Sequence, residues 1–149
     1  KEAKSMHLKN FIETNGYSAS AFASIADYFD FAAIDIKLSN HQAVEEEDYG
    51  DLYRNAMDCI KISAEKRLET IVKVVVLKNT SVKEIEAICS DLADFNVKFV
   101  LQPVTVPSHL QHPDIVPRVE ELFELSETAG RFLQDVIVLP QVHKFMRIR

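Results

Sequence analysis

Two opposite charges lie two residues apart in an otherwise apolar segment, residues 31–37, where Asp35 precedes Lys37. Side chains alternate between the two faces of a strand, so Asp35 and Lys37 share one face with Ala33. The small alanine leaves room beside the carboxylate and the ammonium. The two charges can form a structural ion pair, or they can hold a zwitterionic ligand, with Asp35 taking an amino group and Lys37 a carboxylate. The strand pattern alone leaves both interpretations open.

Polar residues also close the first apolar segment of the chain, residues 10–14. Glu13, Thr14 and Asn15 precede Gly16, whose backbone freedom permits a tight turn from a strand into a helix. By itself this pattern is typical of a structural turn, because Asn-Gly is common in turns.

The last apolar segment ends at Leu139 and Pro140, and His143 follows. A strand that stops at a proline leaves backbone groups unpaired, which makes them available to a planar ligand such as adenine. A fourth feature is Lys73, which interrupts the most apolar segment of the chain. The pattern favours an ion pair inside the sheet for Lys73 over a contact with a substrate.

The elements that must position these residues alternate regularly between strand and helix. Alternation with right-handed crossovers predicts an α/β fold with a parallel sheet covered by helices, in one domain over residues 1–149. Such strands build either a doubly wound sheet or part of a β/α barrel, and both place active sites at the carboxyl ends of the strands. The five expected strands cover residues 10–14, 31–37, 71–77, 97–102 and 136–139, and the four expected helices residues 18–27, 47–66, 81–92 and 114–132.

The pattern also predicts which faces are buried. The β-branched run 71–77 is typical of a strand buried on both faces. In the helix opened by Ser81, Cys89 belongs to the apolar stripe, which indicates packing and not chemistry. In the last helix the expected buried residues are Ile115, Val119, Leu122, Phe123 and Ala129.

Composition limits the function further. The chain has 149 residues and a formal net charge of −6, which argues against a nucleic-acid partner because phosphate-binding surfaces carry a basic excess. No segment is apolar enough to span a bilayer, so no membrane association is expected. Cys59 and Cys89 are 30 residues apart and form neither a metal motif nor a disulfide framework, which indicates a reducing cytoplasm.

Three short motifs in chain order resemble the later half of radical S-adenosylmethionine (SAM) enzymes. They are Glu-Thr-Asn-Gly at 13–16, Asp-Ile-Lys at 35–37 and Leu-Pro-Gln-Val-His-Lys at 139–144. The closest group is the organic-radical-activating type, typified by pyruvate formate-lyase activating enzyme. The resemblance implies the later part of a partial (β/α)6 TIM-like barrel.

The same resemblance implies roles for the first two motifs in binding SAM. Glu13, Thr14 and Asn15 are similar to a strand end near the methionine part of SAM. Asp35 and Lys37 match residues that hold the amino acid moiety. The acidic residue of the first motif can also help to bind a monovalent cation, which makes Glu13 and Asp35 a candidate monovalent-cation site.

The third motif matches a Leu-Pro-Phe-His pattern, which implies that Leu139 and Pro140 meet adenine through backbone groups and that His143 approaches the ribose. The 7-carboxy-7-deazaguanine synthases fit this region better, because they end in Leu-Pro-Gln-x-His and share the Leu101-Gln102 pair after a strand. Their counterpart of Asp-Ile-Lys is usually Ser-Pro-Lys, so the subfamily stays open.

The Cys-x-x-x-Cys-x-x-Cys motif of radical SAM enzymes is absent from these residues, as is the Gly-Gly-Glu-Pro that follows it. In family order both motifs lie before Glu13, so we expect the chain to be a C-terminal portion, with no catalytic residue of its own and inactive alone. The [4Fe-4S] cluster belongs to the full-length protein, an oxidoreductase or lyase that cleaves SAM to a 5′-deoxyadenosyl radical. Its partner is then a glycyl radical enzyme or a small-molecule substrate. A partial barrel also exposes strand edges, which favours self-association.

Two rival hypotheses come from other classes. A flavodoxin-like receiver domain would use Asp35 as phosphoacceptor and Lys78 as its lysine. It also needs an acidic pair at its first strand to bind magnesium, and Glu13 alone is a poor candidate for that pair. A barrel enzyme acting on a phosphate substrate would need glycine-rich loops at its late strands, and the chain has only three glycines.

Overall fold

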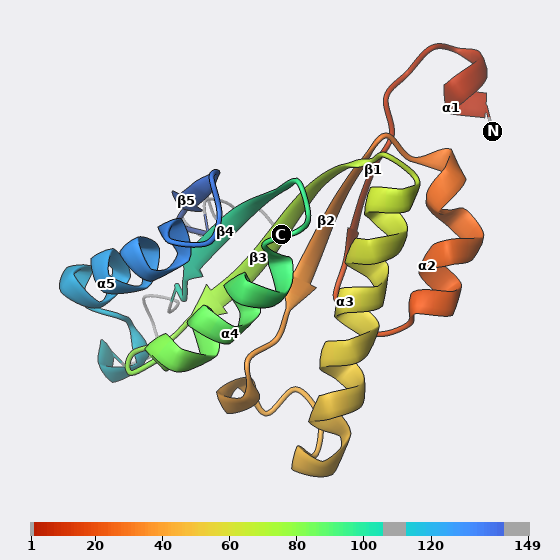
Figure 1. Cartoon of the computed structure of the whole chain (residues 1–149). Helices are drawn as coiled ribbons and strands as arrows, with labels where there is room; N and C mark the ends of the chain where they lie inside the picture. Colours follow the sequence, from red (N-terminus) through yellow and green to blue (C-terminus); the bar gives the residue numbers. More distant parts are fainter. Residues whose placement is uncertain (1, 106–112, 142–149) are drawn as a thin grey trace. The chain divides into compact units, whose positions relative to one another are not determined.

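A computed structural model describes residues 2–105 and 113–141 of the chain (Figure 1). The chain divides into two compact units. The first comprises Lys1–Lys73 and Phe95–Lys98, and the second comprises Val74–Asp94 and Phe99–Arg149. Each unit is built from strands and from helices that pack against them.

Five strands form one sheet, in the order β1-β2-β3-β4-β5. This order never reverses, so the sheet has no topological switch point of the doubly wound kind and instead follows the strand succession of a β/α barrel. The α/β prediction is confirmed. The receiver hypothesis is wrong, because a flavodoxin-like sheet has the order 2-1-3-4-5. The strands are β1 (Phe11–Thr14), β2 (Phe31–Ile36), β3 (Glu69–Val76), β4 (Val97–Pro103) and β5 (Val136–Val138).

Parallel pairing fixes the register at both edges of the sheet. In the first unit Glu13 lies opposite Ala33 and Thr14 opposite Ile34, so β2 continues past the end of β1 toward Asp35. In the second unit Phe99 lies opposite Val136. The register of β1 and β2 therefore brings the polar ends of the first two motifs to the same edge of the sheet.

The helices of the first unit begin where the sequence signals them. The Ser18 side chain accepts a hydrogen bond from Ala21 N at the start of α2 (Ala19–Ile25), and a 3-10 turn (Ala26–Tyr28) follows. Three acidic residues form a 3-10 turn, Glu46–Asp48, directly before α3 (Tyr49–Glu65), where carboxylates are stabilised by the helix macrodipole. Two short elements were not predicted, α1 (Glu2–Ser5) and the 3-10 turn Ser39–His41.

In the second unit α4 (Val82–Leu92) is capped by the Ser81 side chain, which accepts a hydrogen bond from Glu84 N, and it buries Cys89, as the apolar stripe predicts. The last helix differs from its prediction. It begins at Val119 instead of residue 114, as α5 (Val119–Gly130), and Pro113–Ile115 form a separate 3-10 turn. Pro117 disfavours the helical conformation at the residue before it, which separates the two elements.

This late start of α5 changes the buried face. Val119 and Phe123 are 61% and 66% exposed, and Ile115 is 43% exposed, so the prediction that they are buried is wrong. Leu125, Thr128 and Ala129 are buried in their place, and only Ala129 belonged to the expected face. The expected stripe assumed one continuous helix from residue 114, and the break shifted its phase.

Strand β3 is buried on one face and not on both. Val72, Val74 and Val76 are fully buried, whereas the side of Ile71, Lys73 and Val75 is half-buried. The β-branched run therefore reflects strand propensity on both faces but complete burial on only one. In the described part of the chain, no helix combines the length and the apolar character needed to cross a bilayer.

Candidate functional site

The first unit brings four charged side chains together, Glu13 of β1, Asp35 and Lys37 of β2 and its extension, and Lys73 of β3. The Lys73 ammonium donates a hydrogen bond to Glu13 Oε1 and lies 3.0 Å from Asp35 Oδ1. Lys37 Nζ lies 3.4 Å from Asp35 Oδ2. We call these four residues the charged cluster. The face-sharing of Asp35 and Lys37 and the ion pair of Lys73 are confirmed, but the sequence did not reveal that one lysine joins both acids.

The charged cluster is only partly open to solvent. The side chain of Lys73 is 16% exposed, and those of Asp35 and Lys37 are 23% and 27% exposed, whereas Glu13 is 59% exposed. Burial alone would lower the pKa of Lys73, but the adjacent Glu13 and Asp35 carboxylates outweigh burial and hold that pKa above its ordinary value. Lys73 is therefore a cation at neutral pH. The charged cluster thus contains two acidic side chains and two lysine side chains.

The turn after β1 is fixed by local hydrogen bonds. Thr14 Oγ1 accepts from Gly16 N at 3.2 Å, and Asn15 Oδ1 accepts from Tyr17 N at 3.2 Å. Gly16 has a φ of +68°, and a Cβ placed on it would lie 2.8 Å from Ala56 Cα and Cβ in α3. Two features of the structure thus require glycine at this position: the left-handed backbone conformation and the close contact with α3.

The third motif belongs to the second unit. Leu139 N donates to Leu101 O at 3.0 Å, so the pairing of β5 with β4 continues one residue past the strand. The expectation that backbone donors are unpaired at this strand end is therefore wrong for Leu139, and Pro140 has no N–H to offer. Gln141, whose role the sequence did not indicate, is buried and accepts from Thr105 N at 3.1 Å. His143 lies outside the described residues.

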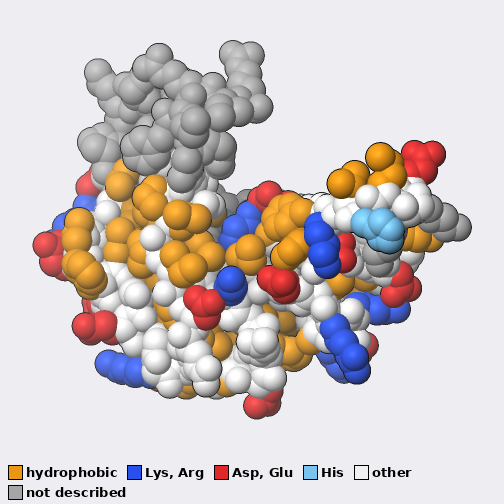
Figure 2. Space-filling view, turned by 90° about the horizontal axis from the view of Figure 1, so that it is seen from above, with side chains coloured by type: hydrophobic (Ala, Val, Ile, Leu, Met, Phe, Trp, Pro, Cys, Tyr) orange, Lys and Arg blue, Asp and Glu red, His pale blue; other side chains and the backbone are white. Residues whose placement is uncertain are grey.

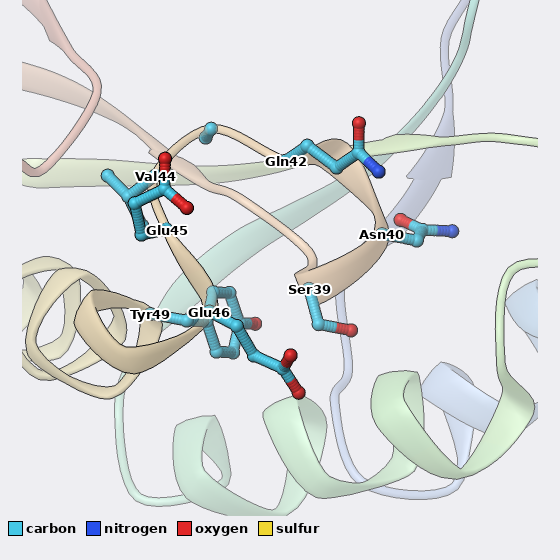
Figure 3. A pocket seen from close by; sticks show the side chains of 8 residues that line it. Ser39, Asn40, Gln42, Val44, Glu45, Glu46 and Tyr49 are labelled. Atoms are coloured by element: carbon cyan, nitrogen blue, oxygen red, sulfur yellow. The ribbon is translucent and has the colours of Figure 1, made fainter.

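A hollow of about 1010 Å³ lies in the loop between β2 and α3, directly after Lys37 (Figure 3). Tyr49 Oη donates to Lys37 O at 3.0 Å and so ties the loop to the end of β2. Sequence reasoning missed this hollow because its loop residues have no periodic pattern. They are Ser39, Asn40, Gln42, Ala43, Val44, Glu45, Glu46 and Tyr49.

The two cysteines do not fit a role as iron ligands. Cys59 and Cys89 are both free and buried, in α3 and α4 respectively. Burial, with a contribution from the Asp58 charge, raises the pKa of Cys59 to about 11, and burial raises that of Cys89 to about 12. Because metals bind the thiolate, these thiols are poor ligands. Among the residues that the structure describes, no group of three His, Cys, Asp or Glu side chains is placed to hold a metal ion.

The surface shows no basic patch on the face drawn in Figure 2, where Lys and Arg side chains are interspersed with Asp and Glu. The net charge of the chain is −6. Lys78, the lysine of the receiver hypothesis, pairs with Asp114 within the second unit.

Four curated proteins match the chain, and all four are 7-carboxy-7-deazaguanine synthases. The protein of Methanocaldococcus jannaschii is 34% identical over 93% of this chain and 55% of its own length. That of Methanothermobacter thermautotrophicus is 32% identical over 95% of this chain and 60% of its own length. The chain thus spans about half the length of these relatives. No family model matches it.

Solved structures agree on the fold. A radical SAM methyltransferase from Sphaerobacter thermophilus superposes with a TM-score of 0.69 at 13% identity, over 96% of this chain and 44% of the other. A domain of pyruvate-formate lyase-activating enzyme from Bacteroides vulgatus gives a TM-score of 0.69 at 13% identity, over 93% and 86%. The chain is thus similar in sequence to 7-carboxy-7-deazaguanine synthases, and it shares the fold of these radical SAM structures. The α/β fold expected from the resemblance to radical SAM enzymes is confirmed, while the activating-enzyme subfamily is not shown.

Proposed function

We propose that this chain is the SAM-binding part of a 7-carboxy-7-deazaguanine synthase. The observation that carries the proposal is the 34% and 32% identity to two such synthases over 93% and 95% of the chain. The Leu-Pro-Gln-x-His pattern at residues 139–143 supports the same subfamily. The synthase alternative is thereby favoured over the activating-enzyme type.

The charged cluster fits the amino acid end of SAM. Asp35 accepts from the ammonium of the ligand and Lys37 donates to its carboxylate. The two side chains lie side by side at the end of β2, with their charged atoms 3.4 Å apart, so a zwitterion can replace their mutual contact with one partner for each. Partial burial strengthens both contacts relative to bulk water.

The remaining SAM contacts come from the turn after β1 and from the third motif. The Thr14 hydroxyl accepts from Gly16 N, so its proton can be donated to a ligand. Asn15 contributes its side-chain amide. Since Leu139 N is already bonded, the contact of Leu139 and Pro140 with adenine falls to their carbonyl oxygens, which accept from the adenine amino group. For His143 the motif predicts a contact with the ribose.

The [4Fe-4S] cluster, when bound, supplies the electron that cleaves SAM. Its ligands are not Cys59 and Cys89, whose thiols are buried and hard to deprotonate. The 149 residues therefore bind and orient SAM, and we expect no turnover from them alone. The enzyme works in the cytoplasm on a small molecule, without nucleic-acid or membrane partners, and the chain alone can self-associate through its strand edges.

The activating-enzyme role, with a glycyl radical enzyme as partner, stays a prediction. Its support is the likeness to a domain of pyruvate-formate lyase-activating enzyme, which at 13% identity concerns the fold alone. The Asp-Ile-Lys motif, where the synthases usually have Ser-Pro-Lys, is the one sequence feature in its favour.

The test uses a protein that carries this chain together with a cluster-binding segment, reconstituted anaerobically with iron and sulfide. The protein is expressed in a host that lacks its own synthase, so that any product comes from it. It should yield 7-carboxy-7-deazaguanine, detected by mass spectrometry, and the Asp35→Asn variant should yield none. The matched control is Lys66→Met, which removes a lysine from the exposed pair with Asp27. Formation of 5′-deoxyadenosine without this product, together with a glycyl radical signal on a partner protein, would favour the activating enzyme instead.

A further inference from the structure

Lys73 stands out because it is the only basic residue in β3, and its ammonium contacts acids from both preceding strands. It donates to Glu13 Oε1 and lies 3.0 Å from Asp35 Oδ1. Its side chain is 16% exposed, which makes it the most deeply placed member of the charged cluster. A surface ion pair would not require a lysine in the middle of the most apolar strand.

The contact of Lys73 with Asp35 is a close ion pair. Asp35 Oδ1 is buried, and it has no hydrogen-bond partner among the residues that the structure describes. The Lys73 ammonium, 3.0 Å from Oδ1, supplies the positive charge that compensates this buried oxygen. A monovalent metal ion between two carboxylates would act in the same way, because it is also a compact positive charge.

The charge balance of the cluster depends on Lys73. With it, two carboxylates face two ammonium groups. Without it, Glu13 and Asp35 would share Lys37 alone and leave one negative charge in a partly buried place, which is costly. That negative charge would attract either a cation from solution or Lys37 itself.

We propose that Lys73 is the built-in counter-ion of the Glu13–Asp35 pair: its ammonium occupies the place where these carboxylates would otherwise bind a monovalent metal ion, and so no such ion is needed. This inference deepens the proposed function. The counter-ion role itself does not depend on SAM binding, and only the effect of Lys73 on SAM affinity rests on the proposed function. Lys73 is then a positioning residue that holds Asp35 Oδ1 and leaves Lys37 as the lysine that meets the carboxylate of the ligand.

The experiment compares thermal unfolding of the chain in potassium chloride and in tetramethylammonium chloride at equal ionic strength. The tetramethylammonium ion is too large to sit between two carboxylates. The unfolding temperature of the wild-type chain should be the same in both salts. Lys73→Ala, which removes the ammonium and opens space, should unfold at lower temperature in tetramethylammonium and regain several degrees in potassium. Lys66→Ala is the matched control and should show no preference between the salts.

Potassium-specific stabilisation of the wild-type chain would overturn the proposal, because it would mean that an ion already binds beside Lys73. An equal loss for Lys73→Ala in both salts would also overturn it. If Lys73→Ala does not fold in either salt, Lys73→Met replaces it, because methionine keeps the apolar stem of the lysine. A Lys73→Met variant that folds, shows no preference between the salts and binds SAM as the wild type does would also contradict the proposal.

SAM titrations in the same two salts separate this inference from the proposed function. The affinity of Lys73→Ala for SAM should fall about tenfold or more in tetramethylammonium, as for the loss of a charged contact, and recover in potassium. Salt-specific unfolding without any SAM binding would uphold the counter-ion and refute the SAM site. SAM binding that is unchanged in Lys73→Ala would support the SAM site and refute the counter-ion role of Lys73.

Discussion

The turn at Gly16 makes a demanding test of how the first unit is assembled. Its φ of +68° lies in the left-handed region, where a residue with a side chain loses about 1 to 2 kcal/mol. An added Cβ would also lie 2.8 Å from Ala56 Cα, and overpacking of this kind typically costs about 1 to 3 kcal/mol. Gly16→Ala should therefore lower the free energy of unfolding by about 2 to 5 kcal/mol.

Urea unfolding followed by far-ultraviolet circular dichroism measures this loss. Gly50→Ala is the matched control, because Gly50 lies in α3 of the same unit with nothing within 4 Å of an added Cβ. It should stabilise the chain by about 0.5 to 1 kcal/mol through the unfolded state. The double variant Gly16→Ala, Ala56→Gly should cost less than the sum of its parts, because the Cβ–Cβ clash disappears. A Gly16→Ala loss below about 0.5 kcal/mol, or strict additivity in the double variant, would refute the close-contact reasoning.

Two further predictions concern buried groups. Thr70 Oγ1 donates to Leu68 O and accepts from Ser63 Oγ at 2.7 Å, so Thr70→Val should cost about 1 to 3 kcal/mol in urea unfolding by leaving Ser63 without its acceptor. Adding Ser63→Ala should restore most of that loss, and a double variant as unstable as the single one would contradict the assignment. Cys59 and Cys89, with pKa values raised to about 11 and 12 by burial, should react with a thiol reagent only after the chain unfolds. Fast labelling of the native chain at pH 8 would show that one of them is accessible.

Much of the fold follows from local signals. Ser18 and Ser81 mark helix starts correctly because their side chains accept backbone hydrogen bonds that the first turn leaves unpaired. The alternation in residues 31–37 assigns Asp35 and Lys37 to one face because the period of a strand is two. These features depend on a few neighbouring residues, and so the sequence contains them.

The failures have a non-local origin. Lys73 was expected to pair with an acid, but its joining of Glu13 to Asp35 depends on the order and register of three strands. The buried face of α5 depended on where Pro113 and Pro117 divide the segment, which shifted the helical phase. Leu139 N was expected to be unpaired because Pro140 ends the strand, yet β4 is long enough to pair with it.

The central claim is that this chain binds SAM through Asp35 and Lys37, and calorimetric titration of the chain with SAM tests it most directly. The wild-type chain should bind one SAM, and Lys37→Met should weaken binding about tenfold or more, as expected for the loss of a charged hydrogen bond. Lys66→Met, which loses an ammonium from an exposed pair, should bind as the wild type does. Absence of SAM binding by a folded wild-type chain, or equal affinity in the Lys37→Met variant, would contradict the account.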